Sequence, residues 1–289
     1  MNQLFRIGDF VFRVTAPGEI VVPPNFLKFA CESECDAAYT YTMELADQFP
    51  EPTGKAVVSH PDLTVYESDG LEKRYIGIKG TPGSYAYYEE TDDRHARVLI
   101  APKAEEILYV DPVWLSLLAM ERRMLGCGAI TLHCAYMRYQ DEAILFSAPS
   151  GTGKTTQATL WEKHRGSRVI NGDKSLLQCM DGRWTARGWP VCGSSGVCHN
   201  EDAPIRAIVM LSQGKADTIR RLSPFQAFTQ LYSQVTINSW NRDAQQKSMD
   251  LIEKLVAQVP VYHLNCTISE DAVRCLEEVL GLEKPDSAE

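Results

Sequence analysis

A glycine-rich segment in the middle of the chain constrains the fold more than any other feature. Residues 148–156 have the sequence Ala-Pro-Ser-Gly-Thr-Gly-Lys-Thr-Thr, follow the apolar stretch 143–146 and open a segment with helical character. A strand, a glycine-rich turn and a helix in this order form phosphate-binding loops, because backbone N–H groups and the helix N-terminus surround an anion. The segment therefore predicts a phosphate-binding loop within an α/β domain.

Separate roles are expected for individual residues of this loop. Lys154 brings a mobile positive charge to the β- and γ-phosphates of a nucleoside triphosphate, and the Thr155 hydroxyl can reach a Mg²⁺ ion. Ala148 stands where the pattern usually begins with glycine, and its small side chain is expected to fit. A plain Gly/Ser-rich turn is the alternative, against which the complete Gly-Lys-Thr ending argues. The candidate nucleotide-binding residues are Ser150, Gly151, Thr152, Gly153, Lys154, Thr155 and Thr156.

Composition excludes several classes of partner. The chain has 289 residues, a formal net charge of −9 and a pI near 5.3, so we expect neither nucleic acid nor an anionic membrane as a partner. No apolar run approaches the roughly 20 residues that a membrane-spanning helix needs. The N-terminus lacks the pattern of a secretory signal, and the nine cysteines form no regular framework. These features predict a cytoplasmic protein.

The cysteines offer little for a metal site. Cys31 and Cys35 are separated by three residues, but no second close pair follows at the spacing of a zinc site. Cys192, Cys198 and His199 are too loosely spaced to form one. Buried free thiols are therefore expected.

The first third of the chain differs from the rest in its pattern of polar and apolar residues. Short segments of alternating polar and apolar residues are separated by Pro, Gly and Asp turns, which is typical of strands with one solvated face. We therefore predict an N-terminal antiparallel β-rich domain over residues 1–110. The expected strands are 10–14, 39–43, 64–66, 74–78, 84–88 and 97–100.

A helix is expected where this β-rich region ends. Residues 113–125 have helical periodicity, with Asp111 as the N-cap and Pro112 at the first helical position. The domain boundary is placed here, with the phosphate-binding domain at 111–281 and a flexible tail at 282–289.

Strands and helices mix in the second region. A strand pair over 131–139 and 143–146 surrounds the turn 140–142, and a helix from 154 to 164 ends at Gly166. This mixture of hairpins and helices predicts a mixed sheet. Further strands are expected at 168–170, 175–180, 184–187, 205–211 and 261–264, and helices at 224–232, 244–258 and 269–280.

Three motifs together resemble a known family. The sequences Ile-Thr-Leu-His-Cys-Ala at 130–135, the loop itself, and Val-Ile-Asn-Gly-Asp at 169–173 are similar to those of HPr kinase/phosphorylase and related serine kinases. The same fold forms the nucleotide-binding half of phosphoenolpyruvate carboxykinase. The resemblance covers about 131–280 and implies a mixed-sheet kinase domain that uses Mg²⁺ with ATP or GTP. It implies catalytic roles for Asp173, His133 and Lys154, and metal ligation by Thr155 and Asp173.

Two departures from the family pattern leave the substrate open. The relatives have two adjacent aspartates where this chain has Gly172, Asp173 and Lys174, so the division between base and metal ligand stays open. They also have a glutamate two residues before an Arg-Gly pair, where this chain has Thr185 before Arg187. The carboxykinase reaction is disfavoured because the second lobe for its substrate would not fit in this chain.

Other polar residues are weaker candidates. The small-residue loop 193–198 with His199 could approach a substrate, or form a surface turn. Lys174 could be a second phosphate clamp or a solvated side chain. Four arginines could neutralise transferred charge, or lie on the surface in ordinary ion pairs. These are Arg206, Arg220, Arg221 and Arg242.

The sequence thus predicts a kinase that transfers a γ-phosphoryl group to a hydroxyl, with the N-terminal domain helping to select the substrate. The expected acceptor is a serine of a small protein, a peptide or the free amino acid. One alternative is a regulatory or scaffold protein that binds nucleotide with reduced transfer, and another is simple hydrolysis. Relatives form oligomers, so a homo-oligomer is possible, although no heptad pattern is present.

Overall fold

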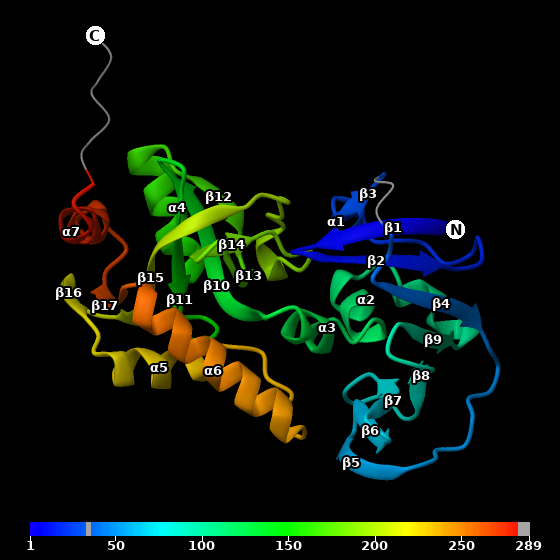
Figure 1. The fold of residues 1–289 in the computed structure, drawn as a ribbon. Coiled ribbons are helices and arrows are strands. Elements are labelled where there is room, and N and C mark those ends of the chain that lie inside the picture. The colour runs from blue at the N-terminus through cyan, green and yellow to red at the C-terminus, as the bar shows by residue number, and fades with distance from the viewer. Residues whose placement is uncertain (33–35, 283–289) are drawn as a thin grey trace. The chain divides into compact units, whose positions relative to one another are not determined.

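The computed structural model describes residues 1–32 and 36–282 and shows a mixed α/β protein with two mixed β-sheets (Figure 1). The chain forms two compact units: Met1–Arg123 with Ser239–Asn241, and Met124–Asn238 with the residues from Arg242 onward. The expected tail at 282–289 lies, from residue 283, outside the described residues. Within the described residues, no helix is long and apolar enough to cross a membrane.

The first unit contains a nine-stranded sheet in the order β3-β1-β2-β4-β9-β8-β7-β6-β5. All six predicted strands are present, while β1, β3 and β5 were not expected. The strands are β1 (Asn2–Ile7), β2 (Phe10–Thr15), β3 (Ala30–Cys31), β4 (Tyr39–Leu45), β5 (Lys55–His60), β6 (Leu63–Ser68), β7 (Leu71–Gly77), β8 (Ser84–Glu90) and β9 (His95–Ile100).

The prediction of a purely antiparallel sheet is wrong. Strands β2 and β4 run parallel, as do β4 and β9. Parallel neighbours require a long connection that carries the chain back before the next strand starts. Residues 16–38 and 46–94 provide these two connections, and the second contains the antiparallel strands β5 to β8. Short alternating segments do not reveal such a long return, so the pattern identified the strands but not their directions.

The single helix predicted at 113–125 is also wrong, since two helices occupy that region. α2 (Asp111–Leu117) and α3 (Met120–Gly126) are separated at Ala119, whose φ is +46°. Pro112 lies in the first turn as expected, but Val110 is the N-cap and no side chain caps this helix. The Asp111 carboxylate instead accepts hydrogen bonds from the Asn25 amide at 3.0 Å and the Phe26 backbone N–H at 3.1 Å. The shorter elements here are α1 (Pro24–Leu27) and the 3-10 helix η1 (Pro102–Ile107).

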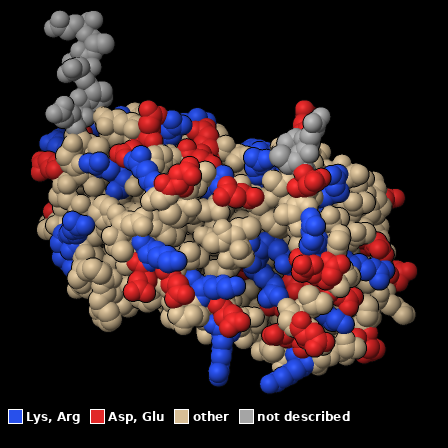
Figure 2. Space-filling model, in the orientation of Figure 1, with Lys and Arg blue, Asp and Glu red and all other residues tan. Residues whose placement is uncertain are grey.

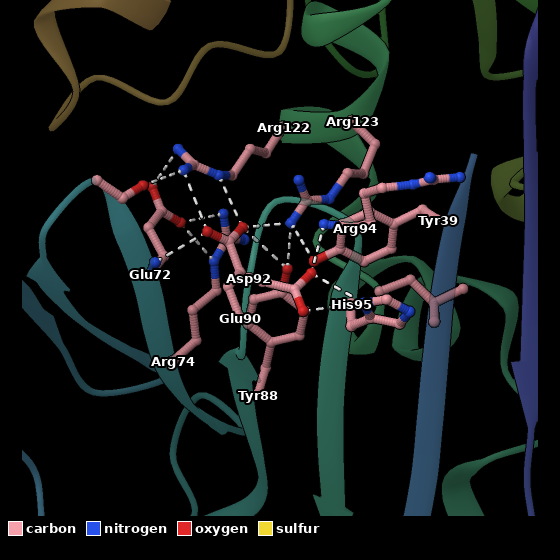
Figure 3. A network of polar contacts seen from close by, with 12 residues as sticks. Tyr39, Glu72, Arg74, Tyr88, Glu90, Asp92, Arg94, His95, Arg122 and Arg123 are labelled. Carbon is pink, nitrogen blue, oxygen red and sulfur yellow. Dashed lines mark hydrogen bonds and ion pairs between the residues drawn. The ribbon is translucent and has the colours of Figure 1, made fainter.

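A buried network of charges ties α3 to strands β7 and β8 (Figure 3). The Arg74 Nη2 atom lies 2.6 Å from a Glu72 carboxylate oxygen, and the Arg122 Nε atom lies 2.9 Å from Glu90. Arg123 also contacts Glu90. The Glu72 and Glu90 side chains are only 0% and 2% exposed, so each depends on these arginines for compensation of its charge.

Removal of one charge from this network is expected to destabilise the protein. Glu90→Gln removes the carboxylate that contacts both Arg122 and Arg123, leaves Arg122 paired with Glu72, and should lower the free energy of unfolding by about 3 kcal/mol. Urea unfolding measures this change. The matched control is Glu44→Gln, because Glu44 forms a half-exposed pair with Arg97 and should cost under about 1 kcal/mol. An equal effect of the two variants would contradict the assigned role of the network.

The Glu90 carboxylate also makes the free energy of unfolding depend on pH. Burial raises the pKa of Glu90, but Arg123 and Arg122 outweigh burial and hold this pKa below its usual value. The ionised Glu90 therefore contributes fully to the free energy of unfolding at a pH above the usual glutamate pKa. This contribution is lost as the pH falls through the lowered pKa of Glu90 in the folded protein. Unfolding free energies measured from pH 7 down to pH 3 should converge for wild type and Glu90→Gln at the acid end.

The second unit has an eight-stranded sheet that is mixed, as predicted. β11, β15 and β17 are parallel neighbours, while the other pairs are antiparallel. All predicted strands are present, and β16 is additional. The strands are β10 (Ala129–Tyr139), β11 (Glu142–Ser147), β12 (Arg168–Asn171), β13 (Lys174–Met180), β14 (Arg183–Arg187), β15 (Ala203–Gln213), β16 (Thr218–Arg221) and β17 (Val261–Cys266).

Helices cover both faces of this sheet. Successive residues of a strand point to opposite faces, and on the central strands both sets of residues are apolar. On β10, Leu132 and Tyr136 belong to the core cluster shared with α5 and α6, and Ala135 and Met137 belong to the cluster shared with α4 and α7. Figure 1 shows these two helix pairs on opposite sides of the strands. The helices are α4 (Lys154–Arg165), α5 (Pro224–Tyr232), α6 (Arg242–Gln258) and α7 (Glu270–Leu280), all close to prediction.

Positive and negative side chains are intermixed on the face shown in Figure 2. Surface ion pairs of the protein include Arg97 with Glu44 and Arg183 with Glu142, each at 2.7 Å.

Candidate functional site

The glycine-rich loop joins the end of β11 to the first residue of α4. Gly151 and Gly153 have φ values of +79° and +107°, a region that residues with a side chain rarely adopt. No side chain caps the N-terminus of α4, which begins at Lys154. Ala148 is fully buried, and its methyl group packs in the core and does not line the pocket in front of the loop. The backbone thus has the conformation in which successive N–H groups can surround an anion.

A substitution at Gly153 tests whether this conformation is needed. Gly153→Ala forces an alanine to adopt a φ of +107° and should destabilise the protein by about 1 kcal/mol or more. It should also weaken phosphate binding if the loop relaxes to another shape. Thermal unfolding and phosphate titration measure the two effects. Gly18→Ala is the control, because a Cβ there meets nothing within 4 Å.

A pocket of about 290 Å³ lies in front of this loop. Four separate segments of the second unit contribute to it: β10, the loop with the start of α4, the turn after β12, and the short helix η2 (Gly193–Ser195). The lining residues are His133, Ser150, Gly151, Gly153, Lys154, Thr155, Thr156, Gly172, Asp173, Ser194 and Ser195. The structure thus brings together every predicted site residue except Thr152, which lines the neighbouring pocket.

His133 and Asp173 lie next to each other in this pocket. The His133 Nε2 atom lies 3.5 Å from the Asp173 Oδ1 atom, and its Nδ1 atom lies 3.3 Å from the Gln234 Oε1 atom. The hydrogen bond with His133 lowers the pKa of Asp173, burial opposes this effect, and the positive charges of Lys174 and Lys154 lower the pKa further. Asp173 is therefore ionised at neutral pH.

Asn171 holds the turn that presents Asp173. Its Oδ1 atom accepts hydrogen bonds from the backbone N–H groups of Asp173 and Lys174, at 2.9 and 3.0 Å. Its Nδ2 group donates to the carbonyls of Trp189 and Val191, at 2.8 and 3.0 Å. Asn171 was part of the recognised motif but not a predicted site residue. An asparagine before glycine at a strand end was the available signal, because asparagine side chains bond to nearby backbone.

Lys154 and Thr155 are held close to the loop. The Lys154 ammonium donates to the carbonyls of Ala148 at 3.1 Å and Pro149 at 3.4 Å, and burial lowers its pKa. The Thr155 hydroxyl donates to the Gly172 carbonyl at 3.1 Å, which leaves its oxygen lone pairs available.

These residues fit a Mg²⁺ ion. Magnesium prefers oxygen ligands and is usually held by one or two protein groups together with substrate phosphates. Here the Thr155 hydroxyl and the ionised Asp173 carboxylate are of that kind. The described residues contain no cluster of three or more His, Cys, Asp or Glu side chains that could hold a metal alone. A magnesium ion would therefore depend on phosphate oxygens for its remaining ligands.

Ser195 occupies the space that a second carboxylate would need at position 172. A Cβ atom added to Gly172 would lie 2.3 Å from the Ser195 Cβ and Oγ atoms. Gly193 is also close, since a Cβ added there would meet the Asp173 carboxyl group at 3.0 Å. The loop of small residues therefore packs directly against the Asp173 turn, and the site has one aspartate.

Other candidates lie outside the pocket. His199 pairs with Arg168, with its Nδ1 atom 3.3 Å from the Nη2 atom. Arg206 donates to the Leu280 carbonyl at 2.7 Å, and Arg187 pairs with Asp202 at 2.9 Å. Lys174 is paired across strands with His133 but does not line the pocket. The remaining arginine candidates, also absent from the pocket lining, are Arg220, Arg221 and Arg242.

The cysteines of the described residues are all free thiols, as predicted. Their burial varies: Cys127 and Cys179 are exposed, and Cys31 and Cys275 are intermediate. Cys35 lies outside the described residues, and with it the candidate pair of Cys31 and Cys35. The buried cysteines are Cys134, Cys192, Cys198 and Cys266.

Comparison with solved structures finds a distant likeness to the HPr(Ser) kinase/phosphatase from Coxiella burnetii. It covers 52% of this chain and 93% of that chain, with a TM-score of 0.31 and 10% sequence identity. These values are too low to support an argument about function. No curated protein gives a significant match.

A family model gives a broader match. The model described as "SynChlorMet cassette protein ScmC" matches residues 99–281, which is more than half of the chain and includes the whole candidate site. This chain belongs to the ScmC family.

Proposed function

We propose that this protein is a kinase that uses a magnesium-bound nucleoside triphosphate, ATP or GTP, to phosphorylate a hydroxyl group. One observation carries the proposal: Lys154, Thr155, Asp173 and His133 converge on a single pocket in front of a glycine-rich loop at the start of a helix. Phosphoryl transfer depends mainly on positioning and neutralisation of charge. This set provides a cation, a metal ligand and a proton acceptor for that purpose.

The loop and Lys154 would bind the triphosphate. Backbone N–H groups at Gly151 and Gly153 and the start of α4 would surround the phosphate oxygens. The Lys154 ammonium would exchange its bonds to the Ala148 and Pro149 carbonyls for bonds to the β- and γ-phosphates. Magnesium, held by Thr155 and Asp173, would neutralise charge on the phosphates when bound.

Asp173 would accept the proton of the attacking hydroxyl. As the hydroxyl oxygen bonds to the γ-phosphorus, the bond from this phosphorus to the β–γ bridging oxygen breaks, and the nucleoside diphosphate leaves. The hydroxyl proton passes to the Asp173 carboxylate, which is ionised at neutral pH. His133, 3.5 Å away, would hold that carboxylate in position.

The acceptor we propose is a serine of a small protein, a peptide or the free amino acid, on the basis of the motifs shared with serine kinases. Selection of this acceptor is assigned to the first unit. The proposal requires neither nucleic acid nor a membrane, and it allows the chain to act as a homo-oligomer.

A second function is favoured by one observation. Ser195 excludes a second carboxylate at position 172, so a single aspartate would have to serve both the metal and the proton. A protein of this kind could bind nucleotide for regulation or scaffolding and transfer its phosphoryl group slowly. Binding without product formation over all acceptors tested would favour this second function.

Removal of metal tests the proposed role of Thr155 and Asp173. Calorimetric titration with ATP in Mg²⁺ should give binding about 10-fold or more tighter than in EDTA, because two of the metal's ligands would come from the protein. Thr155→Val keeps the size of the side chain but removes the hydroxyl, and it should reduce this difference. Equal affinity with and without Mg²⁺ in the wild-type protein would contradict the metal assignment.

A further inference from the structure

A second pocket of about 480 Å³ adjoins the first on the other side of the glycine-rich loop. Gly151, Gly153 and Thr156 line both pockets. The second pocket lies beyond the carboxyl ends of the parallel strands β11, β15 and β17, where ligands of open α/β sheets commonly bind. Its lining is completed by Thr152, Gln157, Gln213, Gly214, Cys266, Thr267 and Ile268.

The wall of this pocket opposite the helix is held in place by hydrogen bonds. The Thr267 backbone N–H donates to Asp217 at 2.6 Å, and the Thr267 hydroxyl donates to the same carboxylate at 3.0 Å. Gln213 donates from its amide to the carbonyls of Gly151 and Thr152, both at 3.4 Å. The pocket is therefore preformed between the loop and the end of β17.

Gln157, which lies on α4, is the unusual residue of the pocket lining. Its side chain is 2% exposed, and its Nε2 group donates to the Thr267 carbonyl at 2.8 Å. Its Oε1 atom is buried and has no hydrogen-bond partner among the described residues. The Cys266 thiol donates to the Ser212 carbonyl at 3.5 Å, and in its hydrogen bond with Gln157 the amide donates to the sulfur, so neither interaction satisfies the Gln157 oxygen. A buried acceptor without a donor is unfavourable, so the site favours a ligand that brings one.

Apolar surface lies beside this acceptor. Ile268 lines the pocket and is 79% exposed. A single exposed isoleucine is ordinary on a protein surface. Here, however, it lies at a pocket that shares its loop with the phosphate site, where a flat base attached to that phosphate chain would cover it. Because the Gln157 oxygen is buried, its donor must enter with a small shift of the Gln157 side chain.

We infer that the second pocket binds the base of the nucleotide and that Gln157 selects a base with an amino group at position 6, namely adenine. This inference rests on the proposed function. Adenine presents an N–H donor at position 6, while guanine and hypoxanthine present a carbonyl oxygen. An oxygen facing the Gln157 Oε1 atom would leave two acceptors without a donor. Rotation of the amide would not help, because its Nε2 group would lose the Thr267 carbonyl.

The test compares four probes by calorimetric titration of the wild-type protein in Mg²⁺: ATP, GTP, ITP and inorganic tripolyphosphate. ATP should bind about 10-fold to 100-fold more tightly than GTP and ITP, because at position 6 guanine and hypoxanthine place a carbonyl oxygen, and not an N–H donor, against the buried Gln157 oxygen. ATP should also bind at least about 10-fold more tightly than tripolyphosphate, because only ATP fills the second pocket.

Variants test whether the preference for ATP over ITP depends on Gln157. Gln157→Met removes the acceptor oxygen and should bring the affinities for ATP and ITP within about 3-fold of each other. Gln246→Met on α6 is the matched control, because Gln246 is exposed, donates to Asp250 at 2.7 Å and lines neither pocket. Thermal unfolding shows whether each variant is folded, and the comparison of probes on the wild-type protein needs no variant.

The outcomes separate this inference from the proposed function. Equal binding of ATP and tripolyphosphate would overturn the base pocket and leave the phosphate site intact. Equal binding of ATP, GTP and ITP, all tighter than tripolyphosphate, would overturn the role of Gln157. Failure of both ATP and tripolyphosphate to bind would overturn the proposed function and the inference together.

Discussion

Replacement of Asp173 by asparagine is expected to lower phosphoryl transfer by about 10³-fold while nucleotide affinity changes by no more than about 10-fold. The amide keeps the size of the side chain and can still contact His133, but it cannot accept the hydroxyl proton. The ionised state of Asp173 in the wild-type protein follows from its lowered pKa, to which His133, Lys174 and Lys154 contribute. Transfer rates in single-turnover experiments and affinities from calorimetry measure the two effects separately.

Asp181→Asn provides the control for this experiment. Asp181 is exposed in the hairpin between β13 and β14 and has a φ of +47°, a conformation that asparagine adopts readily. Its transfer rate should equal that of the wild-type protein. Full activity of Asp173→Asn would show that another group accepts the proton, and the role proposed for this carboxylate would be wrong.

Replacement of Lys154 by alanine is expected to abolish both binding and transfer to the limit of detection, a loss of about 10³-fold or more. Lys154 lines the pocket beside the loop. Its ammonium donates to the carbonyls of Ala148 and Pro149, and it would bind the phosphates of a nucleotide in their place. A loss of affinity for tripolyphosphate as well as for ATP would locate the effect at the phosphates.

Lys163→Ala tests whether the loss is specific. Lys163 is exposed on the same helix, α4, and does not line the pocket, so its removal should leave affinity unchanged within about 2-fold. Thermal unfolding should show that Lys154→Ala is folded, because the ammonium bonds only to carbonyls of the adjacent loop, Ala148 and Pro149, in the hydrogen bonds of the described residues. Unchanged ATP affinity in Lys154→Ala would contradict the phosphate site.

Much of the second unit could be predicted from sequence because its signals are local. Gly166 ends α4 in the left-handed conformation, and Ser269 caps α7, as the patterns of these residues indicate. The hairpin between β10 and β11 turns at Gln140 and Asp141, both with positive φ. The convergence of His133 and Asp173 with the loop followed from motif resemblance, since these residues are distant in sequence.

Other features depended on contacts that no local pattern reveals. The partner of Asp111 is the start of α1, distant in the chain, so a helix-capping pattern led to the wrong role. The parallel strands of the first unit depend on long connections. Asn171 was missed as part of the site because it acts on a turn by bonding to other segments, whereas the loop that contains Ser195 was a candidate and does line the pocket. Local propensity therefore predicted the elements, and tertiary contacts determined directions and supporting residues.

The most direct test of the proposed kinase is ³¹P NMR of the protein with Mg-ATP and a pool of free serine, free threonine and serine-containing peptides. The proposal predicts a new phosphoester resonance that is present with the wild-type protein and absent with both Lys154→Ala and Asp173→Asn. Division of the pool would then identify the acceptor. Release of inorganic phosphate without a phosphoester, or a phosphoester that persists in both variants, would contradict the proposal.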